Sequence, residues 1–144
     1  MATPIEYLDH AADVGLRASG ASLGEAFCEA ARGMFEVMVD TAAVAPVGRH
    51  LVRCHGDTLG DLLVEWLGSL LVQKELTGMV FSRFEAAVRE ADSGFDLQGV
   101  AIGEPLDAAR HAAKTEVKGI SYLGLRVRRG GTGDRWVAEC VLDV

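Results

Sequence analysis

The sequence has few cysteines and no long apolar run, and each scarcity excludes a class of protein. Its three cysteines, Cys28, Cys54 and Cys140, are widely spaced and form no CxxC pair. This spacing argues against a zinc knuckle, a redox pair or a disulfide framework, so we expect reduced thiols in the core. The most apolar stretch, 62–72, contains Glu65 and is far shorter than the roughly 20 residues that cross a bilayer. We therefore expect it to be a core helix.

Basic residues are also scarce, with 14 Lys and Arg against 21 Asp and Glu, which gives a net charge of −7. Because nonspecific affinity for nucleic acid comes mostly from cationic side chains, this balance argues against general binding to phosphate backbones. It favours a cationic or metal-dependent partner. The N-terminal sequence MATPIEYLDH lacks the basic start and apolar run of a signal peptide, so we expect a cytoplasmic protein.

Motifs of independent catalysis are missing as well. The sequence contains no GxxxxGK[ST] loop to hold nucleotide phosphates, and no HExxH or GxSxG motif of a hydrolase. What remains is a chain of 144 residues, 49% apolar and 24% charged. Such a chain can bury a core of its own, and we expect residues 1–144 to form one domain.

Two segments have helical periodicity. The first begins at Ser22, which is followed three residues later by Glu25 in a capping-box arrangement, and we expect it to end near Val39. The second begins at Asp57 or Thr58, and Gly78 is a plausible stop. Their apolar stripes are Leu23, Phe27, Ala30, Met34 and Met38 in the first, and Leu59, Leu62, Leu63, Trp66, Leu67, Leu70 and Leu71 in the second.

Other segments alternate as strands do. Residues 84–88 and 95–97 predict one hairpin, 123–127 and 136–142 predict a second, and 14–19 and 51–54 are shorter strands. We expect 101–113 to be a long irregular connection. The order predicts an α+β fold, a two-layer sandwich with two helices packed on one face of a mixed or mostly antiparallel sheet.

Charged groups outside the apolar stripes gather in three places. The segment 9–13, Asp-His-Ala-Ala-Asp, leads into the first strand, where short acidic residues usually form turns. In the segment 110–118, Lys114, Glu116 and Lys118 would share one face if the chain is extended. At the chain end, Asp143 lies beside the terminal carboxylate of Val144. If Asp13 approached that end, its oxygens would complete a set that hard cations such as Ca²⁺ or Mg²⁺ prefer.

Four stretches of the sequence resemble the archease family. They are DHAADVG at 9–15, LGEAFCEAARGMFEVMVD at 23–40, DLLVEWLGSLL at 61–71 and RHAAKTEVKGISYLGL at 110–125, and the chain closes on LDV. The stretches cover nearly the whole chain, in order and with similar spacing. Ala11 departs from the family, because many relatives have threonine there, and the loop 130–133 is glycine-rich.

The resemblance implies a protein without chemistry of its own that activates the RtcB-type RNA ligase of tRNA splicing. This ligase uses GTP and Mn²⁺, and archease promotes its guanylylation and multiple turnover. The family's divalent site falls on Asp13, Asp143 and the C-terminal Val144, with Ca²⁺ favoured over Mg²⁺ or Mn²⁺. Ligase activation falls on Asp13, Lys118 and Asp143. The resemblance also suggests that His10, His111 and Glu116 lie around these residues and support the site without binding the cation themselves.

Two other functions stay open on the sequence alone. A small acidic domain without a catalytic set could be a general chaperone or adaptor for RNA-modifying enzymes, which would tolerate the loss of Asp13. Two helices on a sheet could also frame a cleft for a small regulatory molecule. In no case do we expect sequence-specific nucleic-acid binding or a membrane partner.

Overall fold

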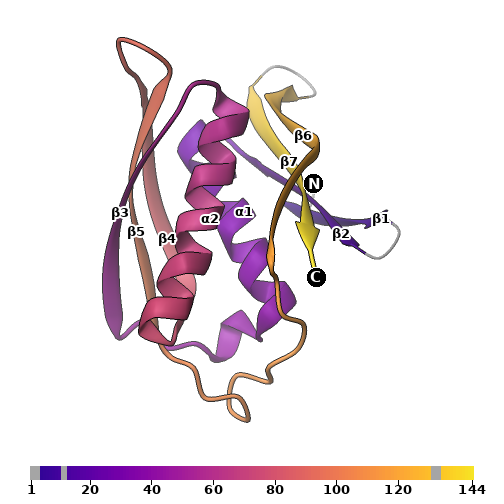
Figure 1. The fold of residues 1–144 in the computed structure, drawn as a ribbon, viewed down its shortest axis with the longest axis vertical. Helices are drawn as coiled ribbons and strands as arrows, with labels where there is room; N and C mark the ends of the chain where they lie inside the picture. Colours follow the sequence, from indigo (N-terminus) through magenta and orange to yellow (C-terminus); the bar gives the residue numbers. More distant parts are fainter. Residues whose placement is uncertain (1–3, 11–12, 131–133) are drawn as a thin grey trace.

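The helices lie between two antiparallel sheets (Figure 1). The computed structural model describes residues 4–10, 13–130 and 134–144, without the side chains of Asp9 and His10. Ala11 and most of the glycine-rich loop, residues 131–133, lie outside the described residues. In chain order the elements are β1 (Ile5–His10), β2 (Asp13–Gly20), α1 (Leu23–Met38), η1 (Thr41–Ala43), β3 (Gly48–Gly56), α2 (Leu59–Thr77), β4 (Met79–Glu90), β5 (Phe95–Pro105), β6 (Gly119–Gly130) and β7 (Arg135–Asp143).

Helix α1 begins with the predicted capping box. The Ser22 hydroxyl accepts a hydrogen bond from the Glu25 N–H at 3.1 Å, and the Glu25 carboxylate accepts one from the Ala21 N–H at 2.6 Å. Both bonds satisfy N–H groups that a helix start leaves free, and such a cap typically stabilises a helix by about 1 kcal/mol. The helix ends at Met38, one residue before the predicted limit.

Helix α2 also follows its sequence signals. The Thr58 hydroxyl accepts from the Asp61 N–H at 3.0 Å, and Gly78 ends the helix in the left-handed conformation with φ of 72°. Five side chains in the middle of the helix are fully buried, Leu62, Leu63, Trp66, Leu67 and Leu70. The Trp66 indole N–H donates to the Phe27 carbonyl of α1 at 2.9 Å. This bond satisfies the polar atom of the largest core side chain and ties the two helices together.

The α+β class and the antiparallel pairing are confirmed, but the expected single sheet is two. One sheet has the order β1-β2-β7-β6 and the other β3-β5-β4, and each described pairing is antiparallel. Helix α1 packs on β4 of one sheet and β2 of the other, and α2 packs on β3 and β6. The wide apolar surface of α2 requires cover on two sides, which one sheet could not give.

One strand was not predicted from the sequence, and the extent of another was wrong. The segment 5–10 is strand β1, which pairs with residues 13–18 of β2 in an antiparallel register. The segment 101–105, expected to be irregular, continues β5 up to Pro105, because Ala101 and Gly103 face the core and pair with β4. The connection thus begins five residues later than predicted and runs from 106 to 118.

Of the three cysteines expected in the core, Cys140 is buried, and Cys28 and Cys54 are half-buried. All three cysteines are free, and burial raises the pKa of the Cys28 and Cys140 thiols to about 12 and that of Cys54 to about 11. The segment 62–72 lies inside α2, at the centre of the core. Neither of the described helices combines the length and the apolar character that crossing a membrane requires.

Candidate functional site

The pairing of β2 with β7 brings the predicted acidic residues together. Val14 lies opposite Leu142, so Asp13 and Asp143 lie one step further along the two antiparallel strands, opposite each other. Side chains at opposite positions share one face, with their Cβ atoms about 5 Å apart. Residues 130 positions apart in the sequence therefore become neighbours at one end of the four-stranded sheet.

The two carboxylates of this row have open surroundings. Both are half-buried, and among the residues that the structure describes neither accepts a hydrogen bond or forms an ion pair. On the other side of Asp143, β6 contributes Gly119, which has no side chain. A Cβ added to Gly119 would lie 3.7 Å from the Asp143 Oδ2 atom, so the carboxylate borders the space left by this glycine.

Val144, the last residue of the sequence, directly follows Asp143. Its side chain is half-buried and packs against the edge of the hydrophobic core. The Lys118 N–H donates a hydrogen bond to the Asp143 carbonyl at 2.7 Å, which ties the last residues to the start of β6. Apolar packing and this backbone bond hold an end that would otherwise fray.

Lys118 lies beside the row, but its side chain serves a different surface. It is exposed and, with Glu116, lines a hollow against the C-terminal turns of α2, formed with Leu71 and Glu75. Lys114, the third charged residue predicted on this segment, instead pairs with Glu36 at 3.1 Å. Glu116 and Lys118 thus line one hollow, and Lys114 and Glu116 line another with Met38 and Lys74.

His111 is fully buried and lies in a separate cluster. Its Nδ1 atom accepts from the Asp107 N–H at 3.0 Å, so Nε2 carries the proton that is donated to Glu104 at 2.9 Å. The Glu104 carboxylate also accepts from Arg110 and the Ala45 N–H. The Arg110 hydrogen bond is the main cause that lowers the pKa of Glu104 to about 2, followed by the bonds from Ala45 and His111.

Of the three residues predicted around the site, none has a described contact with its acidic row. His111 joins the buried cluster, and Glu116 is exposed on the α2 hollow. His10 pairs with Asp13 through the strand register, but its side chain lies outside the described part of the structure. Their roles stay predictions.

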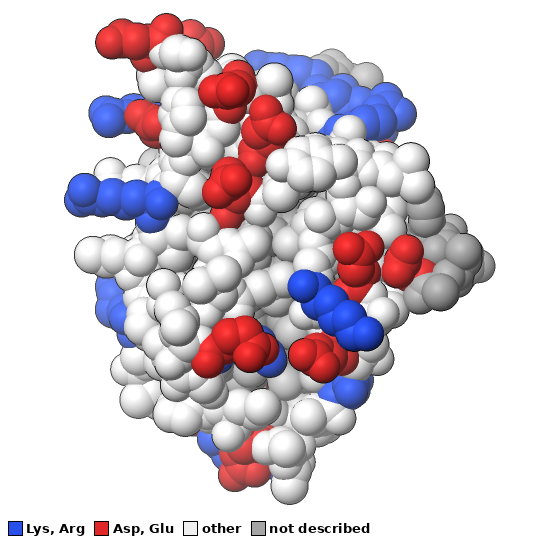
Figure 2. Space-filling model, viewed as in Figure 1, with Lys and Arg blue, Asp and Glu red and all other residues white. Residues whose placement is uncertain are grey.

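The row has the chemistry of a site for a hard cation. Figure 2 shows acidic side chains grouped over the ends of β2 and β7, with a basic side chain beside them. Within the described part of the chain, no three His, Cys, Asp or Glu side chains are placed to share a metal ion. A cation here would therefore need oxygens besides those of Asp13 and Asp143.

Sequence reasoning missed Gly119, whose missing side chain leaves room beside Asp143. A glycine directly after a lysine and before an alternating strand gives no signal of its own. Only the pairing of β6 with β7 reveals its position.

Nearly the whole sequence matches one known protein family. Residues 5–144 match the model of the archease protein family (MTH1598/TM1083). The chain belongs to the archease family. It is 36% identical to Protein archease of Methanopyrus kandleri over 98% of this chain and 99% of the relative. It is 37% identical to Protein archease of Thermococcus gammatolerans over 96% and 97% of the two chains.

A solved archease structure has the same fold. The solution structure of Methanobacterium thermoautotrophicum protein 1598 superposes with a TM-score of 0.86 at 33% identity. The match covers 98% of this chain and 99% of the other. The arrangement of two sheets around two helices is therefore shared with that structure over 98% of this chain.

Proposed function

We propose that this archease is a cytoplasmic, non-catalytic protein that binds a divalent cation and activates a GTP-dependent RtcB-type RNA ligase in tRNA splicing or RNA repair. Its role would be to promote guanylylation of the ligase and repeated turnover. One observation carries the proposal: two carboxylates without a described partner lie opposite each other at the chain end of an archease.

The residues of the row fit a cation. Like charges directly opposite on neighbouring strands repel, so Asp13 and Asp143 weaken the sheet unless positive charge is bound between them. The carboxylates of Asp13 and Asp143 and the terminal carboxylate of Val144 would hold it, and all offer the oxygen atoms that Ca²⁺, Mg²⁺ and Mn²⁺ prefer. When bound, the cation supplies concentrated positive charge at an exposed end of the protein.

Lys118 supports a role for this end in contacting the ligase. Its side chain is exposed and points to the hollow beside α2, and no described residue pairs with its ammonium group. An exposed lysine without an ion pair contributes little to folding, so it remains available to a partner. A protein can activate a ligase only by binding its competent state more tightly than its other states.

The test is ligase turnover with and without this protein. RtcB-type ligase is supplied with GTP, Mn²⁺ and RNA ends bearing a 2′,3′-cyclic phosphate and a 5′-hydroxyl. The proposal expects this archease to increase both ligase–GMP formation and multiple-turnover ligation. No change in either quantity would refute it. Activation that survives Asp13→Ala would favour the general adaptor instead.

A further inference from the structure

The solvent face of the three-stranded sheet carries a hollow of about 590 Å³, lined by both polar and apolar side chains. Two registered rows of side chains form it, one from His55, Asp96 and Arg89 and the next from Arg53, Gln98 and Ala87. The helices lie between this sheet and the sheet that holds Asp13 and Asp143 (Figure 1). The hollow therefore opens on a different side of the molecule from the acidic row.

The two arginines of the hollow have no acidic partner among the described residues. This distinguishes them from Arg17, Arg32, Arg110 and Arg128, each of which pairs with a glutamate at 3.3 Å or less. Arg53 and Arg89 are exposed and come from the two outer strands, β3 and β4. Gln98 lies between them on β5 and adds a neutral donor.

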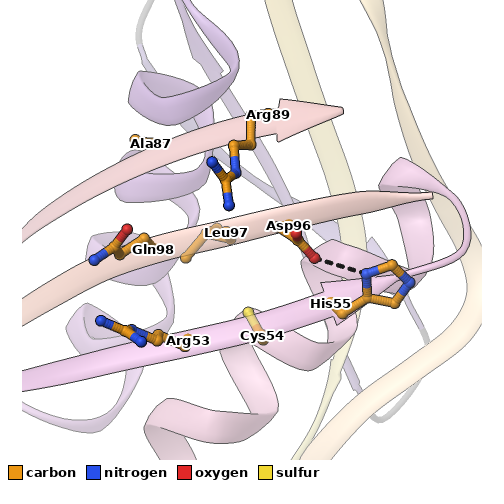
Figure 3. Close-up of a pocket in the computed structure, with 8 residues that line it drawn as sticks. All are labelled: Arg53, Cys54, His55, Ala87, Arg89, Asp96, Leu97 and Gln98. Carbon is orange, nitrogen blue, oxygen red and sulfur yellow. Dashed lines mark hydrogen bonds and ion pairs between the residues drawn. The ribbon is translucent and has the colours of Figure 1, made fainter. Parts of the chain in front are cut away.

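The one carboxylate in the hollow is already engaged. Asp96 Oδ1 lies 2.7 Å from His55 Nδ1, and this hydrogen bond is the main cause that raises the pKa of His55. Figure 3 shows this pair at one end of the hollow, with Arg53 and Gln98 at the other end and Arg89 above the central strand. The imidazole thus lies between Asp96 and, at 3.6 Å, Asp57, and the guanidinium groups face the open space.

These donors define a class of ligand. Guanidinium groups bind phosphate oxygens through paired, charge-assisted hydrogen bonds. The volume is within the range of sites for small molecules. No phenylalanine, tyrosine or tryptophan is among the described residues that line the hollow, so it lacks the stacking platform of single-stranded nucleic-acid sites. We propose that this hollow binds a small phosphorylated molecule through Arg53 and Arg89, with Gln98 as a supporting donor.

The proposal goes beyond ligase activation and is independent of the cation site. Its test is a titration of the whole protein with inorganic pyrophosphate, AMP, citrate and a short oligouridine RNA at physiological salt, followed by calorimetry and amide chemical shifts. Pyrophosphate or AMP should bind saturably at one site, with shifts centred on Arg53, Arg89 and Gln98. Asp13→Ala should leave this binding unchanged, which separates the outcome from that of the ligase assay.

Charge-removing variants locate the site. Arg89→Gln and, separately, Arg53→Gln should weaken pyrophosphate binding about tenfold, the loss expected from one charge-assisted hydrogen bond. Arg126→Gln is the control, because Arg126 is exposed on the other sheet and its loss removes the same charge. Melting curves check that each variant is folded. Because the two arginines lie on separate strands, the test still holds if one of the two variants does not fold.

Three outcomes would overturn the proposal. Equal weakening by Arg126→Gln would mean that binding reflects overall charge. Citrate binding without pyrophosphate or AMP binding would assign the arginines to carboxylates, as on an acidic protein surface. Binding of RNA alone would assign the face to a phosphate polymer rather than to a small molecule.

Discussion

The connection 106–118 joins two polar regions that differ in every respect. At its beginning, His111 is fully buried and both of its ring nitrogens are hydrogen-bonded, one of them to Glu104. At its end, Asp13 and Asp143 are half-buried, opposite each other and without a described partner. Buried polar groups must be satisfied to be tolerated, so the first region stabilises the fold. In the second region like charges repel across the two strands, and we propose that a bound cation relieves this repulsion.

The largest effect should come from breaking the satisfied region. His111→Ala removes a buried imidazole and leaves the Glu104 carboxylate and the Asp107 N–H each without one partner. We expect the free energy of unfolding to fall by about 3 kcal/mol, measured by urea denaturation. The control is His55→Ala, which removes an exposed histidine also paired with a carboxylate and should cost far less. Equal losses would show that burial does not distinguish the two pairs.

Asp13→Ala, in the acidic row, should not lower the stability of the metal-free protein but should weaken cation binding. Without metal the variant should be at least as stable as the parent, because repulsion with Asp143 is removed. Its affinity for Ca²⁺ and Mn²⁺ should fall by at least about tenfold in titration calorimetry. Asp92→Ala, at the exposed turn between β4 and β5, is the control and should retain the affinity. An unchanged rise in melting temperature on adding metal would exclude Asp13 as a ligand.

Lowering the pH should remove the stabilising contribution of Glu104 in the buried cluster. Its folded-state pKa of about 2 lies below the value of about 4.3 in an unfolded chain, so its ionised form stabilises the fold fully above about pH 5. That contribution is lost as the pH falls from about 4 toward 2. Glu104→Gln should therefore be less stable than the parent at pH 7, and the gap should narrow below pH 4 in urea denaturation. A gap that is independent of pH would contradict the assignment.

The smallest effect on stability is expected at Lys118. Lys118→Ala should change the free energy of unfolding by no more than about 0.5 kcal/mol, because the side chain is exposed and has no described ion pair. Activation of the ligase at limiting archease should nevertheless fall. Lys114→Ala is the matched control on the same connection, where the lysine pairs with Glu36. Full activation by Lys118→Ala would place this lysine among ordinary solvated residues.

The helices could be predicted from the sequence because their signals are local. Ser22 with Glu25 marked one start, Thr58 marked the other and Gly78 marked a stop, and all three act there in the structure. Strands were harder, since alternation shows which side chains face a core but not which sheet a strand joins. Residues 5–10 alternate only weakly and became recognisable as β1 through their pairing with β2.

The candidate site depended on pairing over long distances. The resemblance pointed to Asp13 and Asp143, but only the β2–β7 register places them opposite each other. The same resemblance could not separate His111 from this row, because the burial of its imidazole against Glu104 depends on where β5 ends. A site formed by residues on paired strands that are far apart in the sequence can be recognised only once the strand pairing is known.

The central claim is that the row at the chain end binds a cation and that this binding enables ligase activation. The most direct test compares the native C-terminus with one extended by a short Gly-Ser tail, with an N-terminal Gly-Ser extension as the control. The terminal carboxyl group, with an ordinary pKa of about 3.5, is ionised at neutral pH, and the tail replaces it with a neutral carbonyl beside Asp143.

Ca²⁺ and Mn²⁺ affinity and ligase turnover are measured in parallel on the three proteins. Our account predicts that both quantities fall together for the C-terminal extension and stay unchanged for the N-terminal one. Equal cation affinity in all three would remove the carboxylate of Val144 from the site. Weakened cation binding with full ligase activation would contradict the account, because it would separate the acidic row from the function assigned to it.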